Sequence, residues 1–323
     1  MEHSKILEIL TSSNEYVSGQ SLARTLGVTR QAVWKEINSL RDKGFVIESV
    51  QNRGYRLGAM PDYLVEAAVK SELRTAIIGC ELTVLESVGS TNDFLKQRGN
   101  EGCKSGAVAA AREQVSGKGR LGRVWKTKKD ENVMFSVLLR PKMAPSEVSA
   151  VTPLAGLAVC KALRKLTGLD CRIKWPNDVI VGRKKLVGIL TEMSAEFDAV
   201  EYIIIGTGIN VNQSEFPEEI AHKATSVLLE TGKKFDKNKL LACVLNQMEE
   251  DFISSNLELS SGALEEYTSL CATVGKSVSF SRGGKQLRGT AVGVAENGEL
   301  IVKLDDGAEQ RINSGEVTAQ GIY

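Results

Sequence analysis

The sequence contains no Cys-x-x-Cys pair and only two histidines, His3 and His222, in 323 residues. Zinc sites in proteins are built from closely spaced cysteines and histidines, so this residue set does not suit a structural zinc site. Scattered, unpaired cysteines indicate a reduced, cytoplasmic protein. The six cysteines are Cys80, Cys103, Cys160, Cys171, Cys243 and Cys271.

The chain also lacks a basic and then apolar segment after Met1, and it contains no apolar run of roughly 18 residues. A secretory leader and a membrane partner are therefore not expected. The net charge is only +1, so the chain as a whole does not attract nucleic acid, and any DNA contact must come from a local basic patch. With 42% hydrophobic and 25% charged residues, the chain is predicted to be globular, with two or three domains.

The stretch from Ser116 to Trp125 holds three glycines, three cations and one tryptophan in ten residues. It lacks the Gly-Lys-Ser/Thr ending of a Walker loop and the strand–helix setting of a dinucleotide fingerprint. Closely spaced glycines let backbone N–H groups approach an anion, and the lysine and arginines add full charges. The stretch therefore predicts a phosphate- or carboxylate-binding loop. A flexible basic surface loop is the alternative.

Two further motifs follow this loop: Lys-Trp-Pro-Asn-Asp at residues 174–178 and Lys-Leu-x-Gly-Ile-Leu-x-Glu at residues 185–192. Together with Gly-Lys-Gly-Arg-x-Gly-Arg-x-Trp, in this order, they resemble the biotin protein ligases. The resemblance spans about residues 85–215. It implies a catalytic domain that uses ATP and Mg²⁺ to convert biotin to biotinyl-5′-AMP and then passes biotin to a lysine of a biotin carboxyl carrier protein or domain.

The resemblance also implies the site residues. Lys185 is expected to be the main electrostatic stabiliser of the reaction, and Arg120 is expected to add a guanidinium contact. The biotin-binding residues are expected to be Ser90, Thr91, Asn92, Gln114, Lys118, Gly119, Arg120 and Lys185. The ATP- and adenylate-binding residues are expected to be Gly117, Arg123, Asn177, Asp178 and Asn210.

Some of these positions have other interpretations. Ser90 and Thr91 could simply cap the helix that contains Phe94 and Leu95. Lys185 could be a solvated lysine beside Arg183 and Lys184. No metal ligand is certain, and Asp178 could either hold Mg²⁺ or orient a cation.

Two departures from the family pattern matter. Lys118 stands where many members carry Arg, which keeps the charge but loses the bidentate fork. No Trp occurs in residues 213–223. An aromatic cover for the adenine would then come from Phe216 or from elsewhere.

The first sixty residues predict a winged helix-turn-helix. Ser18 and Thr29 are suitable N-caps for the second and third helices, and Gly27 suits the turn between them. Val33, Ile37 and Leu40 share one face of the third helix at helical spacing. Trp34 is either part of the core or a DNA-facing aromatic, and packing into the core is the favoured interpretation. Arg41 is expected to face outward. Residues 45–57 predict the wing hairpin.

This module carries a local charge of +4, with seven basic and three acidic residues between Gln20 and Arg56. DNA contacts are therefore predicted from exposed donors suited to phosphates and base edges. A helix-turn-helix used only for packing or protein contact is the alternative. The predicted DNA-binding residues are Thr29, Arg30, Gln31, Lys35, Asn38 and Arg53.

The module resembles the N-terminal domain of bifunctional biotin ligases that double as biotin-operon repressors. The resemblance implies operator DNA as a partner, biotinyl-AMP as corepressor, and a homodimer when biotinyl-AMP is bound. A lipoate or other acyl ligase is one rival. A transcription factor whose former ligase domain only senses ligand is another.

The predicted fold class is α+β, with domains at residues 1–60, 63–271 and 272–323. The central domain is expected to contain a mostly antiparallel mixed sheet, including one strand from Ile173 to Val181 and its hairpin partner from Lys185 to Glu192. Alternating residues after Val274, with turns at Asn297-Gly298 and Asp306-Gly307, indicate a small β domain. By resemblance this domain is an SH3-like barrel.

Overall fold

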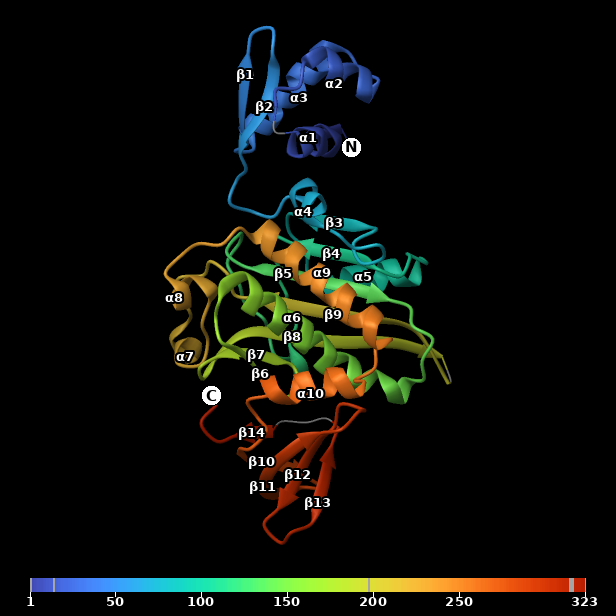
Figure 1. Cartoon of the computed structure of the whole chain (residues 1–323), viewed down its shortest axis with the longest axis vertical. Coiled ribbons are helices and arrows are strands. Elements are labelled where there is room, and N and C mark those ends of the chain that lie inside the picture. Colours follow the sequence, from blue (N-terminus) through green and yellow to red (C-terminus); the bar gives the residue numbers. More distant parts are fainter. Residues whose placement is uncertain (1, 14, 197, 314–316, 323) are drawn as a thin grey trace.

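The computed structural model describes residues 2–13, 15–196, 198–313 and 317–322. The chain forms three parts stacked along its long axis, with the N-terminal module at one end and a small β domain at the other (Figure 1). Residues 314–316 fall in the predicted C-terminal domain but lie outside the described residues.

The N-terminal module has three helices followed by a two-stranded antiparallel hairpin. Ser18 and Thr29 cap the second and third helices, because their side chains accept hydrogen bonds from the amides of Ser21 and Ala32. Gly27 ends the second helix at φ 68°, so the predicted helix-turn-helix is confirmed. The elements are α1 (Glu2–Ser12), α2 (Gly19–Leu26), α3 (Arg30–Asp42), β1 (Val46–Val50) and β2 (Gly54–Ala59).

Two predictions on helix α3 are wrong. Trp34 does not enter the core but is 56% exposed, because Val33, Ile37 and Leu40 already fill the inward stripe of the helix. Arg41 is held within the module, where its guanidinium donates to the carbonyl of Ile47 at 2.6 Å and 3.0 Å.

The central domain is built on a seven-stranded mixed sheet in the order β3-β4-β5-β9-β8-β7-β6. Only β3 and β4 are parallel; the other neighbours are antiparallel, as predicted. The strands are β3 (Leu82–Leu85), β4 (Ala107–Ala111), β5 (Val133–Leu139), β6 (Cys171–Lys174), β7 (Asp178–Val181), β8 (Lys184–Glu196) and β9 (Ala199–Ile209).

The single strand predicted over Ile173–Val181 is wrong. The segment forms two antiparallel strands, β6 and β7, with Trp175, Pro176 and Asn177 at the turn between them. Pro176 has no amide hydrogen to give to a ladder, so the strand is interrupted there. The turn directs Asn177 and Asp178 toward strand β8. The predicted hairpin is confirmed between β7 and β8.

Helices cover both faces of the sheet. Helices α6 and α9 pack against each other and bury Phe135 and Val137 of β5, whereas α5 packs on the opposite face against Leu138. The longer helices are α4 (Glu66–Glu72), α5 (Thr91–Asn100), α6 (Val151–Thr167), α9 (Lys237–Ser255) and α10 (Ser261–Leu270). The short ones are η1 (Arg120–Gly122), η2 (Pro145–Ala150), α7 (Glu218–Ala221) and α8 (Val227–Thr231).

Helix α6 and the preceding turn make a stretch, Pro145–Thr167, that is long and apolar enough by composition to cross a membrane. The sequence analysis found no such stretch. In the structure 72% of its most apolar window is buried inside the fold, as expected for the central helix of a core.

The C-terminal domain is a five-stranded antiparallel sheet in the order β13-β12-β11-β10-β14. The predicted turns are confirmed: Gly298 and Gly307 lie between paired strands at φ 83° and φ 88°. An SH3-like barrel is compatible with this sheet and stays a prediction. The strands are β10 (Ser277–Arg282), β11 (Lys285–Val294), β12 (Leu300–Leu304), β13 (Glu309–Ile312) and β14 (Val317–Ala319).

Candidate active site

Two adjoining cavities lie where the glycine loop crosses strands β8 and β9. The smaller, of about 60 Å³, is lined by the start of α5 and by the middle of both strands. The larger, of about 630 Å³, extends past the β6–β7 turn toward β14. A common set of residues lines both cavities, so the two cavities meet at these residues. These shared residues are Gly119, Arg120, Trp125, Asn177 and Lys185.

The smaller cavity has a continuous polar wall. The Thr91 amide and hydroxyl donate to Gln114 Oε1 at 2.7 Å and 3.1 Å, and the same hydroxyl lies 2.7 Å from Ser136 Oγ. Ser136 in turn donates to Asn92 Oδ1, and the Asn92 amide donates to Glu192 Oε2, each at 2.6 Å. The wall therefore offers both donors and acceptors in fixed positions, as a ureido ring requires. Ser136 and Glu192 were not predicted as site residues.

The capping interpretation of Ser90 and Thr91 is not supported by the geometry. Ser90 occupies the N-cap position of α5, but its side chain makes no capping hydrogen bond. The Thr91 hydroxyl is directed to Gln114 and Ser136 instead. Both residues are buried at the cavity, so their side chains serve the polar wall rather than the helix end.

Three glycines that the sequence analysis did not assign to the site form its floor. A Cβ on Gly206 would lie 2.2 Å from Asn92 Oδ1, and a Cβ on Gly208 would lie 2.7 Å from Trp125 Cε2. Gly188, paired with Gly208 across the ladder, would meet Trp125 at 2.9 Å. Only glycine permits this close approach. The signal was present in the Gly-x-Gly spacing of residues 206–208.

Two buried polar atoms at this floor lack a partner. The Trp125 indole N–H and the Thr207 hydroxyl each make no hydrogen bond to any described residue. Leaving a buried polar group unsatisfied costs about 1–3 kcal/mol. Such groups mark a place that a polar ligand would satisfy.

Lys185 lies at the junction of the two cavities. Its ammonium is 2.5 Å from Asp178 Oδ1 and 5.5 Å from the centre of the Trp125 ring. The Asp178 carboxylate thus orients a cation in this structure. Arg120 donates to Asn177 Oδ1 at 3.0 Å, and Asn177 donates to the carbonyl of Ile189 at 2.8 Å, so that the loop is tied to the β6–β7 turn.

The electrostatic field at the junction is strongly positive. The pKa of Lys174 is lowered to about 8, chiefly by burial; Asp178 opposes this shift, and the nearby Lys185, Arg123 and Lys223 contribute to it. Burial also lowers the pKa of Arg120. A site that lowers the pKa of its own cations gains most from a bound anion. Lys174 belongs to the Lys-Trp-Pro-Asn-Asp motif but was not predicted as a site residue.

The remaining predicted ligand-site residues line one of the two cavities, except Gly117, which is buried behind Trp125 and lines neither. The Lys118 ammonium faces the Asp93 carboxylate at 2.6 Å, and a Cβ on Gly117 would lie 2.5 Å from the Trp125 carbonyl. Arg123, Asn210 and Phe216 line the larger cavity. Asn210 is buried and donates to the carbonyl of Thr225, so one edge of its amide is already used by the protein.

The predicted DNA-binding residues lie on helix α3, at its N-cap and in the turn between β1 and β2. Arg30, Gln31 and Lys35 are exposed along α3. The Thr29 hydroxyl caps this helix, and Asn38 accepts a hydrogen bond from Arg41 at 3.3 Å, so both also have structural partners. Arg53 lies over the Tyr16 ring at 4.8 Å, near the tip of the hairpin.

Comparison with known proteins assigns a family to each of the three parts. The biotin/lipoate A/B protein ligase family matches residues 84–210, an HTH domain matches residues 2–56, and the biotin protein ligase C-terminal domain matches residues 273–318. The chain is 33% identical to the bifunctional ligase/repressor BirA of Bacillus subtilis over 311 residues, which cover 94% of this chain and 95% of that protein. It is 30% identical to the Escherichia coli protein of the same name, covering 92% and 91% of the two chains.

Solved structures agree. A biotin protein ligase from Aquifex aeolicus, in complex with biotin and ATP, is 31% identical to this chain at a TM-score of 0.64. The alignment covers 75% of this chain and 99% of that one. Fold and site thus define a protein ligase of the biotin/lipoate class joined to a DNA-binding module. Within that class, the chain belongs to the family of bifunctional ligase/repressors.

Proposed function

We propose that this chain joins biotin to AMP, transfers the biotinyl group to a lysine of a biotin carboxyl carrier domain, and represses transcription when it holds the biotinyl adenylate. The observation that carries this proposal is the meeting of the two cavities at Arg120 and Lys185. A small ring with a ureido group fits the polar wall of one cavity, and a nucleotide fits the other. The carboxylate and the α-phosphate would then meet at the cationic junction.

In the first step a biotin carboxylate oxygen attacks the α-phosphorus of ATP, and the bond to pyrophosphate breaks. Both reactants are anions, so the barrier is dominated by charge repulsion. Lys185, released from Asp178, would face the phosphorus as it becomes five-coordinate, and Arg120 would neutralise the carboxylate. Removing one such contact costs roughly 3–4 kcal/mol in the transition state.

Mg²⁺ is proposed to enter with ATP. No group of three or more His, Cys, Asp or Glu side chains in the described part of the chain could hold a metal ion. Asp178 is the only carboxylate among the described residues that line the larger cavity. One carboxylate plus phosphate oxygens suits Mg²⁺, which keeps several waters. When bound, the ion would neutralise charge on the pyrophosphate.

In the second step the uncharged amine of the acceptor lysine attacks the acyl carbon of the mixed anhydride. A C–N bond forms, the bond to the phosphate oxygen breaks, and AMP leaves. The acceptor must reach the junction from outside, and the exposed Lys118, Leu121 and Val124 lie on that side of the loop. ATP, carrier domains and operator DNA all occur in the cytoplasm, which is the proposed location.

Repression is proposed to require a homodimer. A single winged helix reads a short half-site, so specific affinity needs two copies on a palindrome. Ordering of the glycine loop by the adenylate would favour pairing of two chains, because the entropic cost of ordering the loop is already met.

One experiment tests both activities. The protein is incubated with biotin, ATP and Mg²⁺, with and without a carboxylase carrier domain, while pyrophosphate, AMP and biotinylated carrier are measured. Sedimentation and DNA titration then use a palindromic duplex selected in vitro by the loaded protein. We expect a pyrophosphate burst, carrier biotinylation, and tighter DNA binding by an adenylate-bound dimer. Reaction with lipoate instead of biotin would favour the acyl-ligase rival, and ligand-dependent DNA binding without pyrophosphate release would favour the sensor.

A further inference from the structure

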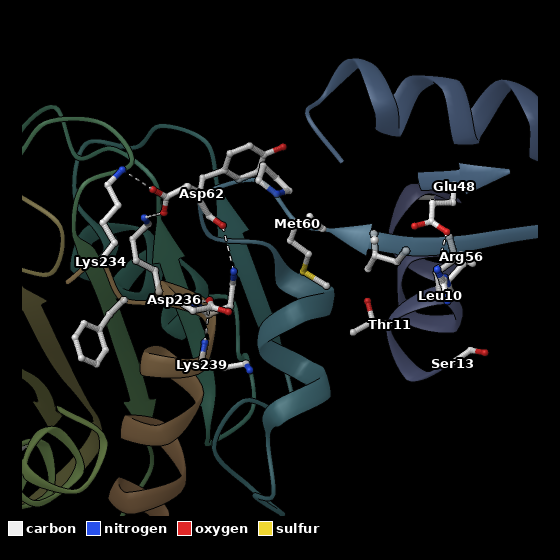
Figure 2. A pocket seen from close by; sticks show the side chains of 18 residues that line it. Leu10, Thr11, Ser13, Glu48, Arg56, Met60, Asp62, Lys234, Asp236 and Lys239 are labelled. Carbon is white, nitrogen blue, oxygen red and sulfur yellow. Dashed lines mark hydrogen bonds and ion pairs between the residues drawn. The ribbon is translucent and has the colours of Figure 1, made fainter. Parts of the chain in front are cut away.

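The N-terminal module meets the ligase domain at the linker Pro61–Tyr63 and at helix α4. A cavity of about 870 Å³ lies beside the linker, between α1 and β2 on one side and the start of α9 on the other (Figure 2). Figure 2 shows Asp62 facing Lys234 at the edge of this cavity, with Glu48 and Arg56 across it. Polar contacts between the two parts are therefore gathered on the linker.

On the DNA-binding side, Tyr63 holds the end of helix α3. Its hydroxyl donates to the carbonyl of Lys43 at 2.7 Å, and Lys43 is the C-cap of α3. Its ring also packs edge-on against Phe45, with 6.4 Å between ring centres and an interplanar angle of 90°. Phe45 is buried in the core of the N-terminal module. Tyr63 thus contacts both the C-cap carbonyl of α3 and the core beneath the helix.

On the ligand side, the same ring lies under Arg112. The Arg112 guanidinium carbon is 3.7 Å from the ring centre, and the guanidinium makes a two-point ion pair with Asp130 at 2.7 Å and 2.8 Å. The Asp130 amide donates back to the Arg112 carbonyl at 3.0 Å. These two residues close the base of segment 113–129, which contains Gln114 and the whole glycine loop. A bidentate Arg–carboxylate pair of this kind is geometrically strict.

The neighbouring residue Asp62 is tied to the nucleotide side. It forms ion pairs with Lys234 at 3.3 Å and with Lys237, whose side chain is 1% exposed at the start of α9. A buried ammonium at the positive end of a helix depends on such a partner. Asp236 is the N-cap of α9, and Phe235 precedes it. The Asn212 side chain donates to the Phe235 carbonyl and accepts from the Phe235 amide, each at 2.9 Å. Asn212 lies two residues beyond Asn210 of the larger cavity.

We propose that Tyr63 is a positioning residue that transmits the state of the ligand loop to helix α3 within one chain. Arg112 and Asp130 hold the two ends of the loop together. The Tyr63 ring packs on the Arg112 guanidinium and would move with it. The Tyr63 hydroxyl donates to the C-cap residue of α3. Ordering of the loop by biotinyl-5′-AMP then favours one setting of the DNA-reading helix. The inference rests on the proposed repressor function and adds to it a contact path separate from dimer formation.

The test compares Tyr63→Phe with wild type in the full-length protein. This variant removes only the bond to Lys43 and keeps the ring between Arg112 and Phe45. Tyr202→Phe is the matched control, because it also removes a tyrosine hydroxyl, which donates to Asn100 Oδ1 at 2.7 Å and lies 3.5 Å from the Lys96 carbonyl inside the ligase domain. The DNA is the in vitro selected palindrome, and its Kd is measured with and without biotin, ATP and Mg²⁺. Sedimentation of the same samples reports dimer formation.

We expect Tyr63→Phe to form the adenylate and to dimerise like wild type. Its ratio of DNA affinities with and without adenylate should fall at least about threefold, within the usual range of allosteric coupling. Reciprocity requires that bound DNA raise the equilibrium affinity for the adenylate less in this variant than in wild type. Tyr202→Phe should keep the full ratio. Arg112→Lys, which loses the fork, should lower the ratio, and its double variant with Tyr63→Phe should lose no more than the larger single effect.

A Tyr63→Phe protein that forms adenylate and keeps the wild-type affinity ratio would overturn the inference and leave the proposed function standing. Additive losses in the double variant would also overturn it, because the two residues would then act independently. A wild-type protein whose DNA affinity ignores the adenylate would overturn the repressor function and this inference together.

Discussion

The two end modules are attached to the ligase domain in opposite ways. The C-terminal sheet shares one continuous hydrophobic core with the ligase domain, in which Val278 and Phe280 belong to the same cluster as Leu154 and Ile205. The N-terminal module has a separate core, to which the beginning of the ligase domain adds the buried Val65, Ala67 and Ala68 and the partly buried Tyr63.

Polar contacts sharpen this contrast. The buried Trp175 indole of the β6–β7 turn donates to the carbonyl of Gly298 at 2.9 Å, and Ser149 donates to the carbonyl of Asn297 at 2.7 Å. A Cβ on Gly298 would lie 2.9 Å from the Ser149 carbonyl, so only glycine fits this turn against the ligase domain. The N-terminal module instead adjoins an 870 Å³ cavity. The C-terminal sheet is therefore packed as part of the catalytic unit, whereas the N-terminal module keeps a core of its own beside a cavity.

Deleting residues 1–60 tests this contrast most severely. We expect complete loss of specific DNA binding, while carrier biotinylation remains within about tenfold of wild type, because both cavities lie in the retained part. Val65, Ala67 and Ala68 would become exposed, so the thermal midpoint should fall. A folded product without any ligation would show that the N-terminal module belongs to the catalytic unit.

Lys185→Ala should lower the rate of adenylate formation far more than it lowers biotin affinity. The pyrophosphate burst should fall about 100-fold or more, and biotin binding should change far less, because the charge acts mainly on the five-coordinate phosphorus. Lys184→Ala is the control, since Lys184 is exposed on the same strand. Equal bursts in the two variants would mean that Lys185 is an ordinary solvated lysine.

Trp175→Phe loosens the C-terminal sheet. The Gly298 carbonyl loses its donor, which should lower the free energy of unfolding by about 1–3 kcal/mol. Because Val317 and Thr318 line the larger cavity, the KM for ATP should rise, by up to about tenfold, while that for biotin should not. An unchanged KM for ATP in a destabilised variant would reduce this contact to a purely structural one.

Raising the pH should weaken ATP binding more than biotin binding. The pKa of Lys174 is about 8, so its charge is largely present at pH 7 and largely lost at pH 9. ATP affinity should fall by up to about fivefold over that range, and biotin affinity should fall less. Lys174→Gln should remove most of the pH dependence. If the variant keeps the wild-type pH profile, the titrating group lies elsewhere.

Trp34→Ala gives the smallest expected effect. An exposed side chain contributes little to stability, so the free energy of unfolding should change by less than about 0.5 kcal/mol. Its place on α3 beside Lys35 predicts a loss of DNA affinity of roughly threefold, or about 0.7 kcal/mol. Ligation rates measured alongside should match wild type. A large loss of stability would mean that Trp34 packs more than its exposure indicates.

Local chemistry predicted most of the fold. Caps at Ser18 and Thr29, and turns at Gly298 and Gly307, depend on one residue and its neighbours, so the sequence shows them directly. Trp34 could not be placed in this way, because a helix face is decided by which neighbours fill the core first. The break at Pro176 was visible in the sequence, but the predicted hairpin grouped residues 173–181 as one arm.

The candidate site was predicted unevenly for the same reason. Charged residues such as Arg120 of the glycine loop and Lys185 of β8 have a chemical signature at their own positions. Gly188, Gly206 and Gly208 matter only because Trp125 and Asn92 approach them from other elements, and such contacts are invisible along the chain. The depressed pKa of Lys174 likewise results from burial and from cations distant in sequence.

The three tryptophans lie in three different parts of the molecule, so their fluorescence can report on each part separately. Trp34 is exposed on the DNA-reading helix, Trp125 lies half-buried beside the Lys185 ammonium, and Trp175 is buried at the junction with the C-terminal sheet. Their indoles are in three different environments, so their emission should differ in wavelength and in quenching by solutes. Variants that keep one tryptophan at a time would turn the protein's own fluorescence into separate reporters of DNA contact, ligand-loop closure and C-terminal docking.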